Sequence, residues 1–242
     1  MPVDLDRISI LFEDKTILVV DKPAGLLTIA TETEKENTLY AALRARASRK
    51  HPPEKIFIVH RLDREASGLL VFAKTVEAKE DLQNQFKDHS AGRRYLAAVE
   101  GRIAKDDFSV RSYLAENAAY RVYSTRKKGA GKLAITHVHV VKRGPKRSLV
   151  RVQLETGRKH QIRVHLAEQG FPIVGDKIYG SRSNPIRRLA LHGEYLSFRH
   201  PGTGNRMEFE SSIPLLAEEG RMRRAKRRRR RGGQTGKMFP PN

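Results

Sequence analysis

One polar loop of the sequence places an acid between two arginines. It reads His60-Arg61-Leu62-Asp63-Arg64-Glu65-Ala66-Ser67-Gly68 and joins two apolar segments. Nearby positive charge favours the ionised form of a carboxyl group, so Asp63 is placed to carry a negative charge. Such a carboxylate can act as a nucleophile, a base, a metal ligand or the partner in a structural ion pair. The residue types alone leave these four roles open, and the structural ion pair is the commonest of them.

The overall charge points to a polyanionic partner. The 242 residues carry a formal charge of +21, and 48 of them are Lys or Arg. Residues 221–242 hold ten of these and no acid, so the rest of the chain is basic in its own right at +11. This balance favours nucleic acid as the partner. We expect the tail at 221–242, which lacks apolar periodicity, to be disordered and to bind phosphates without sequence preference.

Composition also excludes several classes of protein. The chain has no cysteine, so disulfides, thiolate metal sites and cysteine nucleophiles are excluded. Its apolar runs are too short for a membrane helix, and residues 1–7 lack the features of a secretory signal, so we expect a cytoplasmic protein. The glycine-rich nucleotide-binding loops and the Gly-x-Ser-x-Gly hydrolase motif are absent from the sequence.

A second basic stretch runs from Thr156 to His165. On a helix, Arg163 would share a face with Lys159, while Ile162 and Leu166 would point toward the core.

The histidines do not match a metal site. His160 and His165 are five residues apart without an acid between them, unlike the His-Glu-x-x-His pattern of zinc enzymes. His137 and His139 alternate on an expected strand and so share one face. We expect neither pair to bind metal, and we expect His160 and His165 to pack internally or to contact phosphate.

Apolar patterning predicts a mixture of helices and strands. The expected helices are 37–50 (with Asn37 near its cap), 75–88 (capped by Thr75) and 160–169; the expected strands are 17–21, 55–60, 68–74, 94–100, 133–142, 148–155 and 207–209, and 189–198 is ambiguous. Strands 133–142 and 148–155 should pair antiparallel across a short turn. We therefore expect an α+β fold with a largely antiparallel sheet in one domain, 1–220, followed by the tail.

Taken in order, these segments resemble the RluA-type pseudouridine synthases, which isomerise uridine to pseudouridine in structured RNA. The loop from His60 to Gly68 is similar to the family's signature. The other similar segments are Ile17 to Gly25, Arg94 to Gly101, Thr156 to Gly180, Leu191-His192, and His200-Pro201 with Thr203-Gly204.

The resemblance implies a pseudouridine synthase fold, in which helices flank a largely antiparallel mixed sheet with a central RNA-binding cleft. It implies that Asp63 is the essential carboxylate, which attacks C1′ or C6 of the uridine or removes a sugar proton to give a glycal. It sets Arg163 against Asp63 and Tyr95 beside the uracil. It gives Arg61 the space vacated by the flipped base and Ile162 the floor of the pocket.

The remaining RNA contacts are expected from the basic residues of the two motifs, Arg64, Arg158, Lys159 and His160. Large-subunit rRNA is the favoured substrate and tRNA the rival. The isomerisation involves no redox change and no phosphate transfer, so we expect no metal and no organic cofactor. We expect a monomer. The alternatives are a catalytically inactive RNA-binding or ribosome-assembly relative and a different aspartate-dependent enzyme on the same scaffold.

The sequence departs from the family's pattern in two ways. Ala66 stands where the family usually carries threonine, and its lack of a hydroxyl removes a hydrogen-bonding group from the loop. The first motif begins near residue 17, so we expect a stand-alone form without the S4 RNA-binding module that often precedes the family's catalytic domain.

Overall fold

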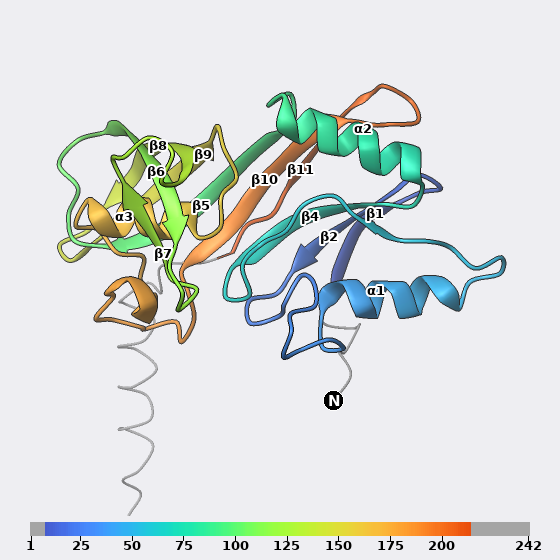
Figure 1. Cartoon of the computed structure of the whole chain (residues 1–242), viewed down its shortest axis with the longest axis horizontal. Helices are drawn as coiled ribbons and strands as arrows, with labels where there is room; N and C mark the ends of the chain where they lie inside the picture. The colour runs from blue at the N-terminus through green and yellow to red at the C-terminus, as the bar shows by residue number, and fades with distance from the viewer. Residues whose placement is uncertain (1–7, 214–242) are drawn as a thin grey trace, which may run out of the picture.

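Eleven strands join into one sheet in residues 8–213, the part of the chain that the computed structural model describes (Figure 1). The strand order is β1-β2-β4-β10-β5-β9-β8-β6-β7, with β3 paired to β4 and β11 paired to β10. The strands are β1 (Ser9–Glu13), β2 (Ile17–Lys22), β3 (Phe57–Ile58), β4 (Ser67–Ala73), β5 (Gly92–Glu100), β6 (Asp107–Glu116), β7 (Val122–Thr125), β8 (Lys132–Arg143), β9 (Arg147–Leu154), β10 (Leu191–Arg199) and β11 (Arg206–Glu210). The expected α+β fold is confirmed, and the predicted tail lies outside the described residues.

In the described residues, three α-helices and one short 3-10 helix accompany the sheet, namely α1 (Leu39–Ser48), α2 (Val76–Lys87), α3 (Gln161–Glu168) and η2 (Lys177–Tyr179). Helix α2 begins as predicted at Thr75, whose hydroxyl accepts a hydrogen bond from the Ala78 amide. Helix α1 is capped by Thr38, whose hydroxyl accepts from the Ala41 amide, so Asn37 lies next to the cap as predicted, and its side-chain amide donates to Glu34. None of the helices in the described residues is long and apolar enough to cross a membrane.

Strand β4 is buried on both of its faces. Leu70 and Phe72 pack into the core cluster that contains the apolar face of α1, whereas Leu69 and Val71 pack into the cluster that contains α2. Figure 1 shows the two helices on either side of this half of the sheet. Because both faces are covered, β4 reads as a continuous apolar run.

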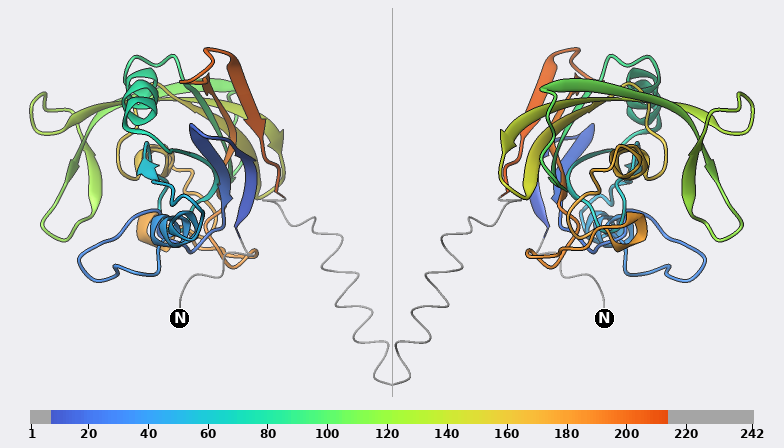
Figure 2. Two further views of the ribbon diagram at one scale, coloured as in Figure 1. Left: turned by 90° about the vertical axis from the view of Figure 1, so that its right-hand side faces the viewer. Right: turned by 90° about the vertical axis from the view of Figure 1, so that its left-hand side faces the viewer.

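The other half of the sheet consists of β5, β9, β8, β6 and β7. It curves at its β7 end, as Figure 2 shows, and Val122 of β7 packs with Val164 of α3. Ile162 and Leu166 of α3 join the same core cluster as α1. Helices α1 and α3 therefore serve one continuous core, and the loop that contains Asp63 contributes Leu62 and Ala66 to it.

The sheet is antiparallel except where β4 meets β10. Among the named strands of residues 8–213, only this pair is parallel, with Ser67 opposite His192 and Gly68 opposite Gly193. The predicted antiparallel pairing of β8 and β9 is confirmed. The segment predicted as a strand over 55–60 pairs only at Phe57 and Ile58, the ambiguous segment is β10, and β1, β6 and β7 were not predicted.

Candidate active site

The loop between β3 and β4 is anchored by Lys22, which is fully buried at the end of β2. Its ammonium group donates to main-chain carbonyls of two segments. In the segment after β2 the acceptors are Pro23 (2.9 Å) and Leu26 (2.7 Å), and in the loop they are Arg64 (3.3 Å) and Ala66 (2.6 Å). Burial lowers the pKa of Lys22 to about 7, while the charges of nearby carboxylates act in the opposite direction. Lys22 therefore links the segment from Ile17 to Gly25 to the loop that contains Asp63.

Thr28 provides a second anchor. Its hydroxyl donates to the carbonyl of Leu62 (2.9 Å) and accepts from the amide of Leu62 (3.2 Å), next to Asp63. Ala66, where the family usually carries threonine, is buried in the core, and its main-chain carbonyl is one of the contacts of Lys22. The loop is thus fixed through its backbone at several points, so the carboxylate of Asp63 is presented on a rigid support.

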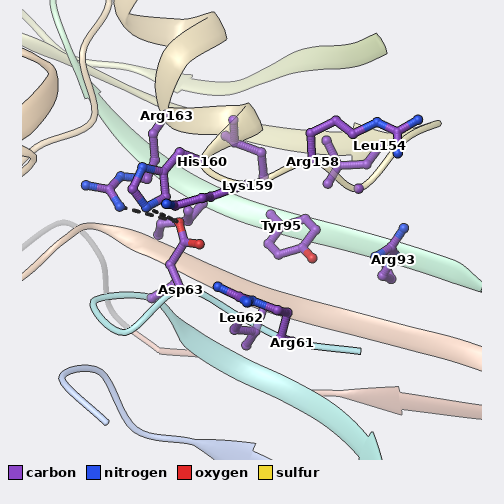
Figure 3. A pocket seen from close by; sticks show the side chains of 14 residues that line it. Arg61, Leu62, Asp63, Arg93, Tyr95, Leu154, Arg158, Lys159, His160 and Arg163 are labelled. Atoms are coloured by element: carbon purple, nitrogen blue, oxygen red, sulfur yellow. Dashed lines mark hydrogen bonds and ion pairs between the residues drawn. The ribbon is translucent and has the colours of Figure 1, made fainter. Parts of the chain in front are cut away.

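The side chain of Asp63 lines a pocket of about 270 Å³ between the two halves of the sheet. Figure 3 shows Asp63 pointing toward Arg163 and His160, while Tyr95 and Arg93 project from β5. The lining residues are Arg61, Leu62, Asp63, Ala66, Arg93, Tyr95, Leu154, Gly157, Arg158, Lys159, His160, Ile162, Arg163 and Leu191. The loop from His60 to Gly68 and the segment from Thr156 to Gly180 thus meet at one pocket, as the resemblance implied.

The carboxylate of Asp63 faces a buried guanidinium group. Nη1 of Arg163 donates to Oδ2 of Asp63 at 3.4 Å, and Nε2 of His160 lies 4.0 Å from the same oxygen. The side chain of Asp63 is 19% exposed, so it remains open to the pocket, whereas that of Arg163 is only 2% exposed. This is the ion pair that the resemblance implied.

Asp176 forms a second and tighter ion pair with the same arginine. Nε and Nη2 of Arg163 donate to its two carboxylate oxygens at 2.7 and 2.9 Å. Burial lowers the pKa of Arg163, but the hydrogen bonds with Asp176 outweigh that effect and hold the pKa above its ordinary value. The prediction that Arg163 shares a face with Lys159 is wrong, because Lys159 precedes α3 and Arg163 turns inward to this carboxylate.

His160 connects the pocket to η2. Its backbone is left-handed (φ 53°), and its Nδ1 lies 2.9 Å from the hydroxyl of Tyr179. Burial lowers the pKa of His160, although the charge of Asp63 opposes the shift. The shift favours the neutral ring, which has one N–H donor and one acceptor nitrogen.

Tyr95 stands on β5 and is 7% exposed. Burial raises the pKa of its hydroxyl, partly opposed by Arg93, so the hydroxyl keeps its proton at neutral pH. Leu154 and Ile162 supply apolar surface to the same pocket. The combination suits a flat, uncharged ring with a polar edge.

Eight of the nine predicted site residues line this pocket, and Arg64 does not. The guanidinium of Arg64 instead donates to the carbonyl of Gly25 (3.3 Å), because the chain turns there away from Asp63. His60 also points away, and its Nε2 accepts from the amide of Val71. Burial lowers the pKa of His60 to about 3, which favours the neutral ring that accepts this hydrogen bond.

Sequence reasoning missed three contributors, Arg93, Leu154 and Asp176. Arg93 lies two residues before Tyr95 on the same strand, so the period of two could have placed both in one pocket. Asp176 lies in a segment already matched to the family, but nothing in that pattern indicates which cation it contacts.

Comparisons with known proteins agree on one family. Residues 16–168 match the family model described as RNA pseudouridylate synthase. The chain is 40% identical over 217 residues to the uncharacterized RNA pseudouridine synthase YlyB of Bacillus subtilis, covering 88% of this chain and 70% of that protein. It is 37% identical over 225 residues to the ribosomal large subunit pseudouridine synthase D of Neisseria meningitidis, covering 88% of this chain and 59% of that protein.

A solved structure is similar over nearly its whole length. Human RNA pseudouridylate synthase domain containing 1 superposes with a TM-score of 0.70 at 26% identity, covering 94% of this chain and 97% of that one.

Proposed function

This chain belongs to the RNA pseudouridylate synthase family, and we propose that it converts one uridine of large-subunit ribosomal RNA to pseudouridine, with Asp63 as the nucleophile. The observation that carries the proposal is the carboxylate of Asp63, held beside Arg163 at the mouth of a pocket with aromatic and apolar walls. The choice of ribosomal RNA is supported by relatives that are named for the large ribosomal subunit.

The proposed reaction begins with removal of the target uridine from its stack, at a cost of a few kcal/mol. Arg61, which is exposed at the pocket rim, fills the vacated space. Tyr95, Leu154 and Ile162 hold the extruded uracil. The basic side chains of Arg158 and Lys159 then face the phosphates on either side.

The chemistry exchanges one C–N bond for one C–C bond. The N1–C1′ bond breaks, the uracil rotates, and C5 bonds to C1′. The proton lost from C5 is balanced by the proton gained at N1, so substrate and product have the same composition. Asp63 attacks C1′ or C6 or removes a sugar proton, and each of these routes requires the ionised carboxylate. The hydroxyl of Tyr95 serves the late proton transfer from C5.

The protein acts in this proposal as a cytoplasmic monomer without a metal or organic cofactor. The reaction is neither a redox step nor a phosphoryl transfer, so its bond and proton changes require no electron carrier and no phosphate donor.

The proposal is tested by tritium release from RNA that carries 5-tritiated uridine. The full chain is incubated with unmodified large-subunit rRNA and, separately, with unmodified tRNA, and the modified position is mapped. Release from rRNA at one position is the expected result. Release from tRNA alone would show that tRNA is the substrate instead of rRNA. RNA binding without release from either pool would identify an inactive RNA-binding relative.

Asp63→Asn should abolish tritium release because an amide cannot act as the nucleophile. The affinity for RNA should fall by less than about tenfold, since the phosphate contacts remain. Asp106→Asn is a matched control, because Asp106 is an exposed carboxylate that pairs with Arg143 and does not line the pocket. Retained turnover in Asp63→Asn would remove Asp63 from the nucleophile role.

A further inference from the structure

The guanidinium of Arg163 is divided among three carboxylates. Its Nε and Nη2 edge is taken by Asp176 at 2.7 and 2.9 Å, and its remaining nitrogen, Nη1, faces Asp63 at 3.4 Å and Glu65 at 3.6 Å. The side chain of Asp176 is 1% exposed, whereas those of Asp63 and Glu65 are 19% and 47% exposed. The shortest and least screened of these contacts is therefore the one with Asp176.

Asp176 is itself fixed by a tight turn. Gly175 before it has φ +84°, and a Cβ at that position would lie 2.2 Å from the carbonyl oxygen of Arg188. The amide of Asp176 donates to the carbonyl of Ile173, and its carbonyl accepts from the amides of Tyr179 and Ser181. Asp176 therefore cannot follow Arg163 if the guanidinium moves, so the carboxylate acts as a fixed reference for the arginine.

The consequence appears at the oxygens of Asp63. Within residues 8–213, Oδ2 has the contact with Arg163 and Oδ1 accepts no hydrogen bond. A free guanidinium would favour a two-point fork with a carboxylate, in which both oxygens are engaged by short hydrogen bonds. That fork is already formed with Asp176, so Asp63 receives one long contact instead.

We propose that Asp176 is a positioning residue that holds Arg163 by its far edge and balances most of its charge, and so leaves Asp63 with one free carboxylate oxygen for the reaction. This inference rests on the proposed role of Asp63 as the nucleophile. The arginine orients the carboxylate of Asp63, and Asp176 prevents the arginine from engaging both oxygens. Without Asp176, the guanidinium turns toward the pocket and donates to both carboxylate oxygens of Asp63.

Two substitutions at Asp176 separate charge from shape. Asp176→Asn keeps the shape of the side chain and removes its charge, whereas Asp176→Glu keeps the charge and lengthens the chain by one carbon. The single-turnover rate of tritium release should fall by roughly 10- to 100-fold in Asp176→Asn, because the arginine is displaced. The rate should fall less in Asp176→Glu, and the RNA dissociation constant should stay within about threefold in both.

Glu100→Gln is the matched control for support of this segment. Glu100 accepts hydrogen bonds from the amides of Arg182 and Ser183, a few residues after Asp176, but it does not contact Arg163 in the described structure. It should leave the single-turnover rate within about twofold of the wild type. A packing role for Asp176 would instead rank Asp176→Asn above Asp176→Glu, and that order would overturn the proposal.

A double-mutant cycle with Arg163→Met provides a second test that does not depend on Asp176→Asn folding alone. In Arg163→Met, the buried carboxylate of Asp176 loses its partner, so adding Asp176→Asn should raise Tm. The added substitution should also leave the residual turnover of Arg163→Met unchanged, because Asp176 acts only through the arginine. A further loss of turnover in the double variant would show that Asp176 acts by another route and would overturn the proposal.

Asp63→Asn, measured in the same series, distinguishes the two proposals. If Asp63→Asn is inactive while Asp176→Asn turns over like the wild type, the role of Asp176 fails and the proposed function stands. If Asp63→Asn retains turnover, the proposed function fails and the inference about Asp176 fails with it.

Discussion

Tyr95 and Arg93 are two residues apart on β5, so their side chains lie on the same face and both line the pocket. Burial raises the pKa of Tyr95, which favours the protonated hydroxyl over the phenolate, and in the proposed reaction this hydroxyl relays a proton. The ring can stack on uracil whether or not the hydroxyl is present. In the proposed reaction the two parts of the side chain therefore have separate roles: the ring holds the base and the hydroxyl transfers the proton.

Tyr95→Phe should consequently keep RNA affinity and lose turnover. Removal of a proton-transfer group costs on the order of 100-fold in rate, whereas the dissociation constant should change by less than about threefold. Single-turnover tritium release and filter binding of the same RNA measure the two quantities. An equal loss in both would mean that the hydroxyl contributes to binding instead of the late proton transfer.

At the residue scale, the sequence could predict which side chains gather but not how they pair. Asp63, Tyr95 and Arg163 come together because each lies in a matched motif, and the structure confirms that they share one pocket. Their roles stay predictions. The double pairing of Arg163 was out of reach, since it depends on the turn at Asp176, and the orientation of Arg64 depends on the local path of the backbone.

The junction of β4 and β10 decides where the loop of Asp63 returns to the sheet. Gly68 has φ +129°, and a Cβ there would lie 2.3 Å from the backbone nitrogen of Gly193. Ser67 next to it lies 3.0 Å, through its hydroxyl, from Nδ1 of His192 on β10. The close approach of two backbones thus requires glycine on the β4 side, for both conformational and steric reasons.

Gly68→Ala should therefore destabilise the protein far more than an ordinary glycine substitution. Gly170→Ala is the matched control, because Gly170 has φ +85° but open space around its Cβ position. The control should cost about 1 kcal/mol from backbone conformation alone. Gly68→Ala should cost more than about 3 kcal/mol, because the added clash involves backbone on both sides. Urea unfolding of the two variants measures the difference, and equal costs would contradict the steric argument.

At the element scale, prediction succeeded where periodicity was clear. Strands β8 and β9 alternate buried and exposed residues, so their pairing was predictable. Strand β10 was ambiguous because most of its residues are buried and the period of two is lost. The parallel contact of β4 with β10 joins segments more than 120 residues apart, and no local pattern indicates such a pairing.

An ion cluster ties the N-terminal strands to α1 across the molecule. Glu13 at the end of β1 pairs with Arg46 (2.8 Å) and Lys50 of the α1 region and with Lys74 after β4 (3.2 Å). Lys74 also pairs with Glu54 at 2.7 Å, and its side chain is only 4% exposed. The cluster thus joins three elements whose apolar contacts lie deeper in the core.

Glu13→Gln should reveal this cluster through the pH dependence of stability. Burial raises the pKa of Glu13, but the hydrogen bonds with Arg46, Lys50 and Lys74 outweigh it and lower the pKa from 4.5 to about 2. A lowered carboxyl pKa stabilises the folded state above the ordinary pKa, and that contribution is lost as pH falls toward the folded value.

The difference in Tm between the wild type and Glu13→Gln should therefore be largest above pH 4.5 and shrink toward pH 2. Thermal unfolding followed by circular dichroism at several pH values gives this difference. Glu80→Gln, on the exposed face of α2, controls for the substitution itself. A difference that is constant with pH would show that the charge of Glu13 does not contribute.

At the scale of the whole molecule, the charge of +21 divides between two parts that should do different work. The basic residues that line the pocket, such as Arg61 and Arg158, would position the target base in the proposed reaction. The ten basic residues of 221–242 carry almost half of the net charge and match no motif. Contacts of such residues with phosphate release counterions, so their contribution depends on salt rather than on sequence.

Deletion of residues 221–242 should therefore raise the RNA dissociation constant at low salt and flatten its dependence on salt concentration. A full-length variant in which the ten basic residues of that stretch are replaced by glutamine controls for chain length and should behave like the deletion. The single-turnover rate at saturating RNA should stay within about twofold of the wild type, because Asp63, Tyr95 and Arg163 are unchanged. The dissociation constants of the two proteins should converge as salt rises, because screening removes the contribution of the tail. An unchanged low-salt dissociation constant would instead assign RNA affinity to residues 1–220 alone.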